Sequence, residues 1–437
     1  MLHPVRELMR RPMRPALLVP LVLLAGPALQ PSAAPAAVPD PVIGHAVFND
    51  PAGTTAQQNT IQVQLAGLID RVPAGEEIQG SFFGFDPPDT ADTATDPDLV
   101  DRLIAAHDRG VKIKLIVDQK SKNSAATQRL RAAIGSADDQ PSYVVDCADK
   151  SPAGTIRGCI ATRVKQWSDG PVTPYNHNKF FTFSKIRQSS GAEAGSVVYQ
   201  ASANLGIWDQ NEAYNNALTY SDPKTYAAYR TYFSDLRSYR YVAAGNNNYY
   251  KDSGSGTDYR AFFFPRQERA GQPFDDPATD TVYNTLGSVH CTYTEADGSR
   301  HQTDVRVAMW DFNRPAIAQR LAQLRKDGCW VDVVLTNAND AVLTALKSAP
   351  VQITKCNYNV APGIDVRVHS KYLLIDGGFD NDIVPRVYTG SHNFSYSALR
   401  QADEAQVRVM GRTVHDEYLK NFWHIRDTCR AKGGVIT

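Results

Sequence analysis

Hydrophobic and polar positions change period along this chain, and the changes predict helices and strands in a fixed order. Apolar residues recur at helical spacing over 61–69 and 103–110. Three short apolar stretches are strand-like: 43–48, 78–85 and 111–117. A glycine ends the second helix before the next strand begins. Helix, glycine and strand in succession predict a parallel or mixed α/β sheet with helices on both faces.

The second part of the chain repeats this order of elements. The matching strand-like and helical stretches are 259–264, 282–289, 305–310, 317–328 and 330–335. Runs rich in glycine and asparagine between residues 245 and 256 interrupt the pattern and mark a join. We therefore predict two α/β halves, 39–245 and 246–437, that pack closely together. In such sheets the ligand site lies at the carboxyl ends of the strands.

Two matching segments carry the candidate chemistry. HNKFFTFS begins at His177, and HSKYLLID begins at His369. Residues i and i+2 of a strand share a face, so each segment places an imidazole beside the ammonium group of Lys179 or Lys371. Each segment is followed by a small-x-Asn element: Ser202-Ala203-Asn204 and Ser391-His392-Asn393. Two such strands brought together would form a site for a phosphate diester.

The order H-x-K, apolar run and small-x-Asn, given twice, resembles the phospholipase D superfamily, whose signature is H-x-K-x4-D followed by a G-S/G-x-N-type element. The second copy fits fully, with Asp376 as the aspartate and Glu404 on the next strand. The first copy departs from the signature, because Ser184 replaces the aspartate and Asn215 or Asn216 stands where the second half has Glu404. The resemblance implies two tandem α/β/α halves, packed about a pseudo-twofold axis with the active site between them.

These residue types suit cleavage of a phosphodiester. The substrate's negative charge repels a nucleophile, so fixed cations and donors must first neutralise its oxygens. Four side chains are expected to bind the phosphate: Lys179, Lys371, Asn204 and Asn393. A neutral imidazole can then attack phosphorus to give a phosphohistidine, while the second histidine protonates the leaving oxygen. This chemistry requires no metal and no cofactor.

The resemblance also implies which histidine attacks. In the family, the residue after each small-x-Asn element orients the histidine of the opposite half, so Glu404 would orient His177. A carboxylate fixes the histidine tautomer and stabilises the cationic phosphohistidine. We therefore expect His177 to be the nucleophile and His369 to be the general acid and base. Supporting roles are expected for Asp376, Ser202, Ser391, Asn215 and Asn216, with Asp376 structural rather than catalytic and either asparagine as the partner of His369.

The first 38 residues have the order of a secretory signal peptide. Arginines precede the apolar stretch 16–25, which is too short to span a bilayer, and small residues and prolines follow. We expect export through the general secretory route and cleavage near Ala28 to Ala37. Loss of four arginines and one glutamate leaves 42 basic against 45 acidic residues. No basic field then remains to hold a nucleic-acid backbone.

Cysteine usage agrees with export. The six cysteines are even in number and lack the C-x-x-C spacing of a zinc site. Three disulfides are expected in an oxidising compartment, the alternative being that some cysteines stay free thiols. The expected pairs are Cys147 with Cys159, which closes a short loop, Cys329 with Cys356, and Cys291 with Cys429.

The fold does not determine the substrate, because one fold serves many reactions. The superfamily includes secreted phospholipases, cardiolipin-synthase-like transferases, nucleases and tyrosyl-DNA phosphodiesterases. Export and the near-neutral charge favour a secreted phospholipase D that acts on phosphatidylcholine-like lipids at a membrane surface, with transfer to other alcohols open. Four aromatic residues are expected to face the site and to suit a lipid: Phe85, Trp208, Trp310 and Phe312.

Two alternatives stay open. The first is a secreted nuclease or other phosphodiesterase on the same machinery. The second is a phosphate-binding module with little turnover, suggested by the departures at Ser184 and Asn215. Because the duplication supplies both half-sites in one chain, we expect a monomer to suffice for catalysis.

Overall fold

The computed structural model describes residues 37–152, 154–167, 170–434 and 436. The expected signal peptide, 1–38, lies almost wholly outside these residues. The described residues fall within the unit Ala36–Thr437. None of the helices among them is long and apolar enough to cross a membrane.

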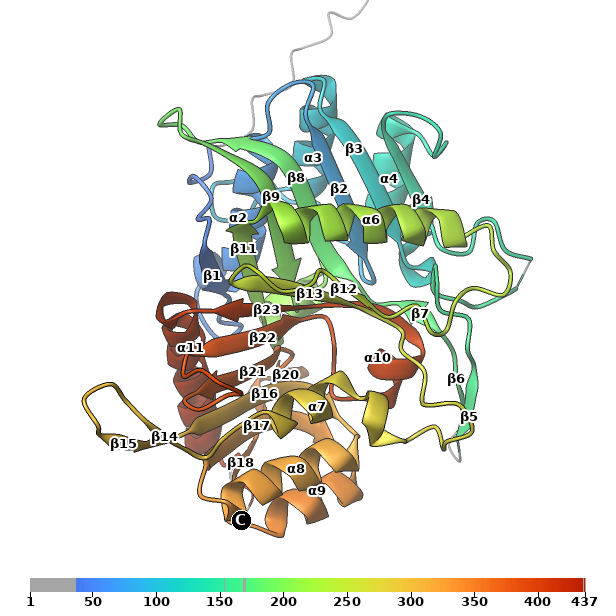
Figure 1. Cartoon of the computed structure of the whole chain (residues 1–437). Coiled ribbons are helices and arrows are strands. Elements are labelled where there is room, and N and C mark those ends of the chain that lie inside the picture. The colour runs from blue at the N-terminus through green and yellow to red at the C-terminus, as the bar shows by residue number, and fades with distance from the viewer. Residues whose placement is uncertain (1–36, 153, 168–169, 435, 437) are drawn as a thin grey trace, which may run out of the picture. The chain divides into compact units, whose positions relative to one another are not determined.

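Seven strands of the first half form one mixed sheet, in the order β1-β11-β9-β8-β2-β3-β4 (Figure 1). Their bounds are β1 His45–Phe48, β2 Glu77–Phe82, β3 Lys112–Val117, β4 Tyr143–Asp146, β8 Lys179–Arg187, β9 Glu193–Ala201 and β11 Asn216–Ser221. Strands β2, β3 and β4 are parallel, and β8 joins β2 antiparallel. The helices of this half are α2 Thr60–Asp70, α3 Leu99–Asp108, α4 Ala125–Ile134 and α6 Pro223–Tyr239.

The second half repeats this arrangement strand for strand. Its sheet has the order β13-β23-β22-β21-β16-β17-β18, with the short β12 added beside β13. The bounds are β12 Lys251–Asp252, β13 Tyr259–Phe264, β16 Asp304–Phe312, β17 Trp330–Ala338, β18 Gln352–Lys355, β21 Lys371–Asp376, β22 Arg386–Gly390 and β23 Ala402–Met410. The helices are α7 Thr281–Gly287, α8 Pro315–Lys326, α9 Asp340–Lys347 and α11 Arg412–Ala431. The predicted duplication of α/β halves is confirmed.

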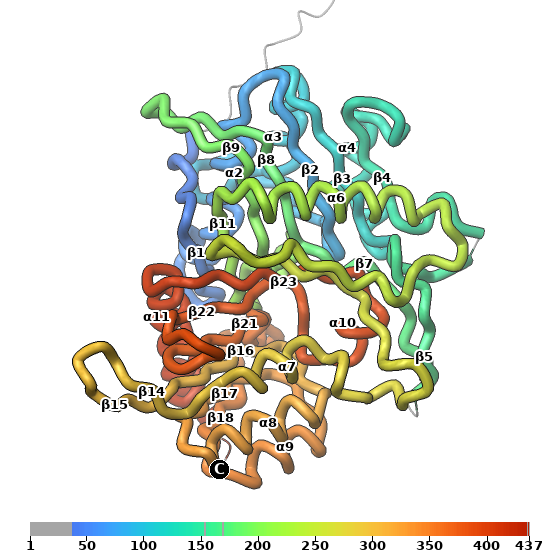
Figure 2. Tube along the Cα trace, viewed as in Figure 1, coloured from blue at the N-terminus to red at the C-terminus, as the bar shows by residue number. Residues whose placement is uncertain are grey.

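Helices α6 and α11 lie between the two sheets, whereas α2 to α4 and α7 to α9 cover the outer faces (Figures 1 and 2). Helix α6 packs on β9 of its own half and on β13 of the other, and α11 packs on β18 and β22 of its own half and on β1. The central core therefore mixes residues of both halves, such as Phe180 and Tyr232 with Phe263 and Phe422. Burial of these large apolar surfaces holds the halves together.

The helix-glycine-strand units predicted from the pattern are present at both expected places. Gly110 follows α3 with φ +92°, and Gly328 follows α8 with φ +101°. Only glycine adopts this left-handed conformation without steric cost, so the glycine stops each helix and turns the chain into the next strand. The expected strand over 78–85 ends earlier, at Phe82.

Shorter elements connect these layers. They are α1 Thr55–Gln58, β5 Lys165–Trp167, β6 Gly170–Val172, β7 Tyr175–Asn176, α5 Ile207–Asn211, β10 Ala213–Tyr214, β14 Thr292–Thr294, β15 Arg300–Gln302, β19 Asn357–Ala361, β20 Ile364–Val368, α10 Tyr396–Arg400 and the 3₁₀ turns Gln119–Ser121 and Pro277–Thr279.

The six cysteines form three disulfides, and the expected Cys147–Cys159 pair is confirmed. The other two expected pairs are wrong, because the bonds are Cys291–Cys329 and Cys356–Cys429. The first joins the segments that lead into the neighbouring strands β16 and β17. The second joins the end of β18 to the last turn of α11, which packs against that strand. The spacing of cysteines along the chain could not predict these two disulfides, because the order of strands in the sheet determines which cysteines meet.

Candidate active site

Two short strands cross from each half to the other and bring the H-x-K motifs together. Strand β7 pairs in parallel with β23, so that Asn176 lies opposite Asp403. Strand β20 pairs in parallel with β10, so that Val368 lies opposite Tyr214. The next residue on each crossing segment is a motif histidine. Each histidine is thereby placed beside the residue that follows the small-x-Asn element of the opposite half.

His177 is held by two hydrogen bonds to this neighbouring strand. Its backbone N–H donates to the carbonyl oxygen of Asp403 at 2.9 Å. Its Nδ1 donates to Oε1 of Glu404 at 2.8 Å, and the hydroxyl of Ser391 donates to the other carboxylate oxygen. Because Nδ1 carries the proton, Nε2 of His177 is left with a free lone pair.

His369 is held in the corresponding way. Its backbone N–H donates to the carbonyl oxygen of Tyr214 at 2.9 Å, and its Nδ1 donates to Oδ1 of Asn215 at 2.9 Å. The hydroxyl of Ser202 donates to the same Oδ1 at 2.8 Å. A second acceptor was missed in the sequence: Oδ1 of Asp209, on α5, lies 3.3 Å from Nδ1 of His369.

The two expected partners of His369 are now distinguished. Asn215 contacts the ring, whereas Asn216 points into the central core. The Nδ2 of Asn216 donates to Oγ1 of Thr389 at 2.8 Å and to the hydroxyl of Tyr418 at 2.9 Å, both in the second half. Asn216 therefore joins the halves and does not orient a histidine.

Both motif lysines are buried beside the histidines. The Nζ of Lys179 donates to the carbonyl oxygen of His177 at 2.9 Å, and Lys371 makes the same contact with His369. Burial lowers the pKa of Lys179 to about 8, and it holds the pKa of Lys371 well below its usual value with help from the charge of Lys179. Two cations confined this closely favour an anionic ligand.

The surroundings keep both imidazoles neutral in the free protein. Burial, and then the charges of Lys179 and Lys371, hold the pKa of His177 well below its usual value. Burial, and then Lys371, lower the pKa of His369 to about 4, although Asp209 opposes this change. Burial raises the pKa of Glu404, against the charge of Lys179 and the hydrogen bond from Ser391.

The amides of the two small-x-Asn elements differ in their contacts. Oδ1 of Asn204 accepts from the N–H of Gly84 at 3.2 Å, and Nδ2 of Asn204 lies 3.3 Å from Asp209. Asn393 is 7% exposed, and its buried Oδ1 has no hydrogen-bond partner among the described residues. An amide in this position has hydrogen-bonding capacity left for a ligand.

The signature aspartate and its replacement each lie five residues beyond the motif lysine of their strand. Asp376 ends β21 and pairs with Arg412 at the start of α11, with Nη1 of the arginine 2.6 Å from Oδ2. In the first half, the hydroxyl of Ser184 donates to Glu76 at 2.7 Å and accepts from the N–H of Glu77 at 2.7 Å. Both contacts are structural, so the departure at Ser184 leaves the phosphate-binding residues in place.

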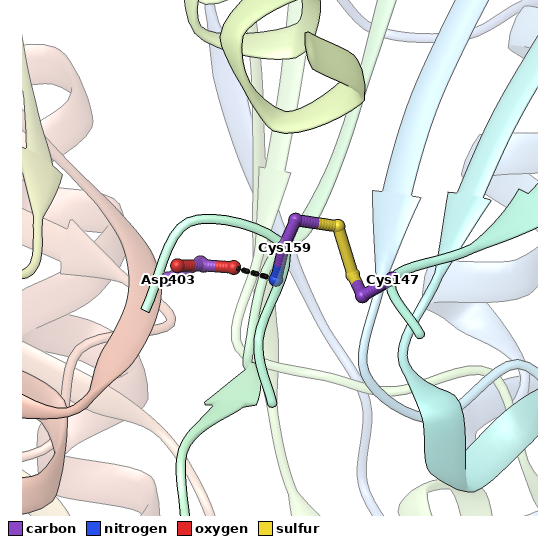
Figure 3. Close-up of side chains that lie close together, drawn as sticks. All are labelled: Cys147, Cys159 and Asp403. Carbon is purple, nitrogen blue, oxygen red and sulfur yellow. Dashed lines mark hydrogen bonds between the residues drawn. A yellow bond between two sulfur atoms is a disulfide. The ribbon is translucent and has the colours of Figure 1, made fainter. Parts of the chain in front are cut away.

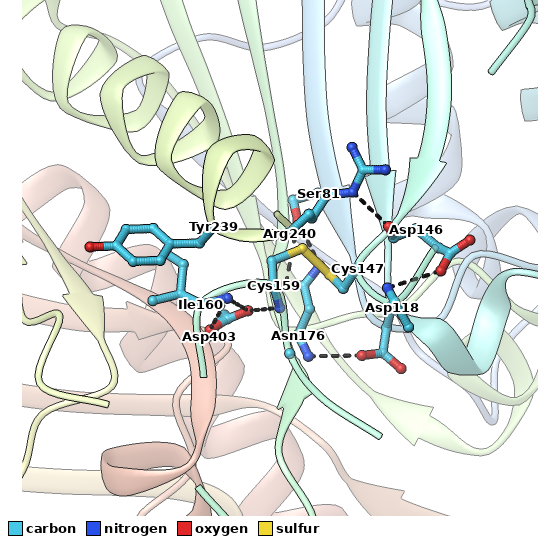
Figure 4. Close-up of a disulfide and its surroundings, with 12 residues drawn as sticks. Ser81, Asp118, Asp146, Cys147, Cys159, Ile160, Asn176, Tyr239, Arg240 and Asp403 are labelled. Atoms are coloured by element: carbon cyan, nitrogen blue, oxygen red, sulfur yellow. Dashed lines mark hydrogen bonds between the residues drawn. A yellow bond between two sulfur atoms is a disulfide. The ribbon is translucent and has the colours of Figure 1, made fainter. Parts of the chain in front are cut away.

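A buried carboxylate next to Glu404 was also missed. Asp403 accepts hydrogen bonds from three successive backbone N–H groups, those of Cys159 at 2.6 Å, Ile160 at 3.1 Å and Ala161 at 2.8 Å. Figure 3 shows the bond from Cys159. The Cys147–Cys159 disulfide ties this loop to the end of β4 (Figure 4). Burial raises the pKa of Asp403 to about 7, in spite of the three N–H donors.

Asp403 thus links the disulfide loop to the catalytic strand. Its side chain binds the loop, and its backbone oxygen binds His177. Cys147, Cys159 and Asp403 are grouped like metal ligands, but the two sulfurs are bonded to each other and the carboxylate is taken by N–H groups. The group is therefore a clamp that positions β23 against β7.

Aromatic rings surround each histidine. Trp208 and Trp310 contact the ring of His369 edge-on, with centroids 5.2 and 5.3 Å away, as the sequence predicted. The expectation for Phe85 and Phe312 was wrong, because both are 0% exposed and pack in the outer cores. The rings that face the site are instead Phe83, just past the end of β2, and Trp310, within β16.

The rings beside His177 are Phe83 and Tyr175, which the sequence did not single out. Their centroids lie 5.1 and 5.5 Å from that of His177. Lys179 and Lys120 also lie over the face of Phe83, at 5.4 and 4.9 Å. Rings in these places shield the imidazoles from bulk water.

A hollow of about 850 Å³ opens next to these residues. Its wall includes the aromatic residues Trp167, Phe274 and Tyr396, together with Asn313. Asn313 donates to Asp311. Burial raises the pKa of Asp311, and the charge of Lys371 opposes this change. The motif histidines and lysines do not line the hollow, which is linked to Lys371 through Asn313 and Asp311.

Comparison with protein families gives a match in both halves of the chain. A family model described as "Cardiolipin synthase, PLD-like domain" matches residues 74–237 and 299–426. The two segments make up more than half of the chain, and each contains one H-x-K motif. No curated protein matches the chain.

Two solved structures have a similar fold. Phosphatidylserine synthase from Haemophilus influenzae Rd KW20 has a TM-score of 0.53 and 10% identity, and the match covers 90% of this chain and 88% of that one. Polyphosphate kinase from Porphyromonas gingivalis has a TM-score of 0.51 and 12% identity, and the match covers 86% of this chain and 46% of that one. The chain thus spans less than half the length of the kinase.

Proposed function

The chain belongs to the family of phospholipase D-like domains, and on this basis we propose that it is a phospholipase D-type phosphodiesterase that works through a phosphohistidine. The membership confirms the superfamily predicted from the two H-x-K motifs. Members of the superfamily are phosphodiesterases and transferases, which supports phosphoryl-transfer chemistry. The proposed reaction is hydrolysis of a glycerophospholipid head group, or its transfer to another alcohol.

The crossed pairing of β7 with β23 and of β20 with β10 carries this proposal. It gives each histidine a partner on Nδ1 and leaves both Nε2 atoms free. The buried Lys179 and Lys371 lie beside the two histidines. A nucleophile, an acid and a phosphate clamp are the parts that two-step phosphodiester cleavage requires.

In the first step, Lys179 and Lys371 bind the non-bridging oxygens of the phosphate, with Asn204 and Asn393 as further donors. The lone pair of Nε2 on His177 attacks phosphorus, and a P–N bond forms as the P–O bond to the leaving group breaks. The leaving oxygen keeps the electron pair and takes a proton from Nε2 of His369. Glu404 stabilises the positive charge that develops on His177.

In the second step, the now neutral His369 takes a proton from an incoming water or alcohol. The resulting oxygen nucleophile attacks phosphorus, the P–N bond breaks and His177 is regenerated. Water gives hydrolysis, and an alcohol gives transfer of the phosphatidyl group. All steps use side chains that the chain itself supplies.

A phospholipid substrate is supported by two observations. The matching family model takes its description from cardiolipin synthase. The hollow beside the site is lined by aromatic rings, which suit the apolar part of a lipid near its phosphate. After loss of the expected leader the chain carries 42 basic against 45 acidic residues, whereas a nuclease benefits from phosphate contacts along a strand. Export of the chain, with a leader cleaved near Ala28 to Ala37, remains part of the proposal.

The intermediate can be trapped. Wild-type protein is mixed with a ³²P-labelled phosphatidyl substrate and quenched within the first turnover, and acid-labile, alkali-stable label on the protein reports a phosphohistidine. We expect His177→Asn to abolish this label and to reduce turnover by at least about 10³-fold, because the nucleophile is lost. His369→Asn should still accept label from a substrate with an activated leaving group. Label that persisted in His177→Asn would reverse the assignment of the two histidines.

The substrate class needs a separate panel. The protein is incubated, with and without chelator, with phosphatidylcholine vesicles, plasmid DNA and bis(p-nitrophenyl) phosphate. Head-group release that survives the chelator supports the proposal. Nicking of DNA without lipid turnover would identify a nuclease, and binding of vesicles without turnover of any of the three would identify a phosphate-binding module.

A further inference from the structure

His369 has a carboxylate neighbour that the motif does not provide. Oδ1 of Asp209 lies 3.3 Å from Nδ1 of His369, and Asp209 is 5% exposed. Burial acts to raise its pKa, but the hydrogen bond to His369 keeps that pKa below its usual value, so the carboxylate is ionised. Nδ1 of His369 therefore points at an anion as well as at the amide of Asn215.

Comparison of the two halves shows that the position of this carboxylate has changed. Glu404 follows Asn393 by eleven residues, and Asn215 follows Asn204 by the same number, so the neutral Asn215 stands where the other half has its carboxylate. Five residues after each asparagine, the first half has Asp209 on α5 and the second half has Ala398 on α10. Each half thus presents one carboxylate to the opposite histidine, but from a different element.

The local structure fixes Asp209 in this place. Its Oδ1 accepts from the backbone N–H of Asn204 at 2.9 Å, and its backbone oxygen accepts from Nδ2 of Asn215 at 3.1 Å. The second bond orients the amide so that Oδ1 of Asn215 faces His369. Asp209 therefore controls both acceptors on Nδ1.

The amide of Asn215 alone would be a poor partner for a histidine that acts as a general acid. It can fix the tautomer of His369, but it carries no charge to hold a proton on Nε2. The charged groups that act on His369 are Lys371, Asp209 and Lys179, and both lysines disfavour the protonated ring. Among these three groups, Asp209 is the one that favours it.

We propose that Asp209 is the positioning residue that favours the protonated form of His369, the general acid, once the phosphodiester is bound, in place of the carboxylate that the first half lacks at Asn215. This inference rests on the proposed function. In the first step, the proton on Nε2 of His369 moves to the leaving alkoxide oxygen, and the positive charge of the ring is lost. Asp209 stabilises the charged ring before this transfer and again when His369 accepts a proton in the second step.

The leaving group separates this role from a structural one. An alkoxide needs a proton as it leaves, whereas p-nitrophenolate does not. We expect Asp209→Asn to lower kcat/KM for an alkyl phosphodiester by about 10²-fold, the scale of general acid catalysis, and to lower it by less than about threefold for a p-nitrophenyl phosphodiester. The asparagine still accepts from the N–H of Asn204. Glu404→Gln, which weakens the nucleophile, should slow both substrates alike.

A rescue variant tests the relocation directly. Asn215→Asp in the Asp209→Asn background returns a carboxylate to Nδ1 of His369 from the strand position that Glu404 has in the other half. We expect the added Asn215→Asp to raise kcat/KM for the alkyl phosphodiester at least about tenfold above that of Asp209→Asn, which is part of the general acid contribution. Equal losses on both substrates in Asp209→Asn, or no rescue by Asn215→Asp, would show that Asp209 acts through Asn204, and the proposal would be wrong.

A second readout does not depend on turnover. The ring nitrogens of His369 can be titrated by ¹⁵N NMR in the intact protein, with His369→Gln to assign the signal. Asp209→Asn should lower the pKa of His369, and the added Asn215→Asp should raise it again. An unchanged pKa would overturn the role of Asp209 even in an active enzyme. Conversely, a lowered pKa in a protein that cleaves no phosphodiester would support the charge pairing and refute only the proposed function.

Discussion

Single residues make the surroundings of the two histidine side chains unequal, although the backbone contacts of the two histidines are alike. Each histidine donates its backbone N–H to the opposite half, and Nδ1 of each imidazole has an acceptor. His177 has a carboxylate alone, at 2.8 Å, whereas His369 shares its Nδ1 proton between an amide and a carboxylate. The stronger single acceptor favours His177 as the group that becomes a cationic phosphohistidine. The shared arrangement suits a ring that gains and loses a proton.

The pKa values of these residues predict an unusual dependence of the rate on pH. In the free enzyme the pKa of His369 is about 4, chiefly through burial and then through Lys371. The general acid must be protonated, so kcat/KM should fall about tenfold for each pH unit above about 4. The bound phosphodiester adds a negative charge that raises the pKa of His369, so kcat should fall only at higher pH.

Loss of charge in the phosphate clamp should cause a second decline of kcat/KM with pH. Burial lowers the pKa of Lys179 to about 8, so loss of its proton above that pH should weaken substrate binding. Both limbs can be measured with a soluble short-chain phospholipid between pH 4 and 10, with an ether-linked analogue to exclude ester hydrolysis. A kcat/KM that rises between pH 5 and 7 would contradict the assignment of His369 as the acid.

At the scale of elements, the crossing strands and one loop determine the position of the site. Strand β7 is only two residues long, yet it carries His177 to β23. The loop held by Asp403 lies against this crossing, and Gly158 allows the close approach. A Cβ at Gly158 would lie 2.7 Å from Oδ2 of Asp403 and 2.9 Å from the carbonyl oxygen of Tyr175. The placement of the segment that carries His177 therefore depends on this loop.

Removal of the disulfide next to this loop should affect the rate as well as the stability. In Cys147→Ser/Cys159→Ser, the N–H groups that bind Asp403 lose their tether to β4. We expect a loss of about 2–4 kcal/mol in the free energy of unfolding. We also expect a several-fold lower kcat at temperatures where the protein stays folded. Chemical denaturation and steady-state assays measure the two effects.

The matched control is Cys291→Ser/Cys329→Ser, which removes a disulfide in the segments that lead into β16 and β17. This variant should lose stability by a similar amount and keep its kcat. If both double variants kept full kcat, the loop would only stabilise the fold, and the clamp at Asp403 would have no part in placing His177.

For the whole molecule, the sequence predicted the duplication and both H-x-K motifs, because these depend on local period and motif spacing. The association of Glu404 with His177 was predicted from the family resemblance. The confirmed Cys147–Cys159 pair closes a short loop, which is also a local property. The two wrong disulfides and the missed Asp209 depend instead on the order of strands and on contacts between segments far apart in the chain. The site-facing aromatics were half right, because Phe85 and Phe312 pair with the segments of Leu205 and Phe394 and pack in the outer cores, contacts that the local pattern does not show.

The shared central core gives the last prediction, which concerns the integrity of the two halves. Helix α6 of the first half packs on β13 of the second, and α11 of the second packs on β1 of the first. Expressed separately, the fragments 39–245 and 246–437 would expose core residues such as Tyr232 and Phe422. Neither fragment would retain the acceptor of its own motif histidine, since Glu404 and Asn215 lie in the opposite fragment.

We therefore expect each fragment alone to lack a cooperative thermal transition by near-UV circular dichroism and to lack activity, whereas co-expression of both should recover both properties. The matched control is the full chain cut at a protease site inserted beside the exposed Ser255, in the loop between β12 and β13. Because the core and the crossing strands hold the halves together without this peptide bond, the cut protein should keep most of its activity. A single fragment that unfolded cooperatively and turned over substrate would show that one half contains a complete site, which would contradict the crossed arrangement of the histidines and their acceptors.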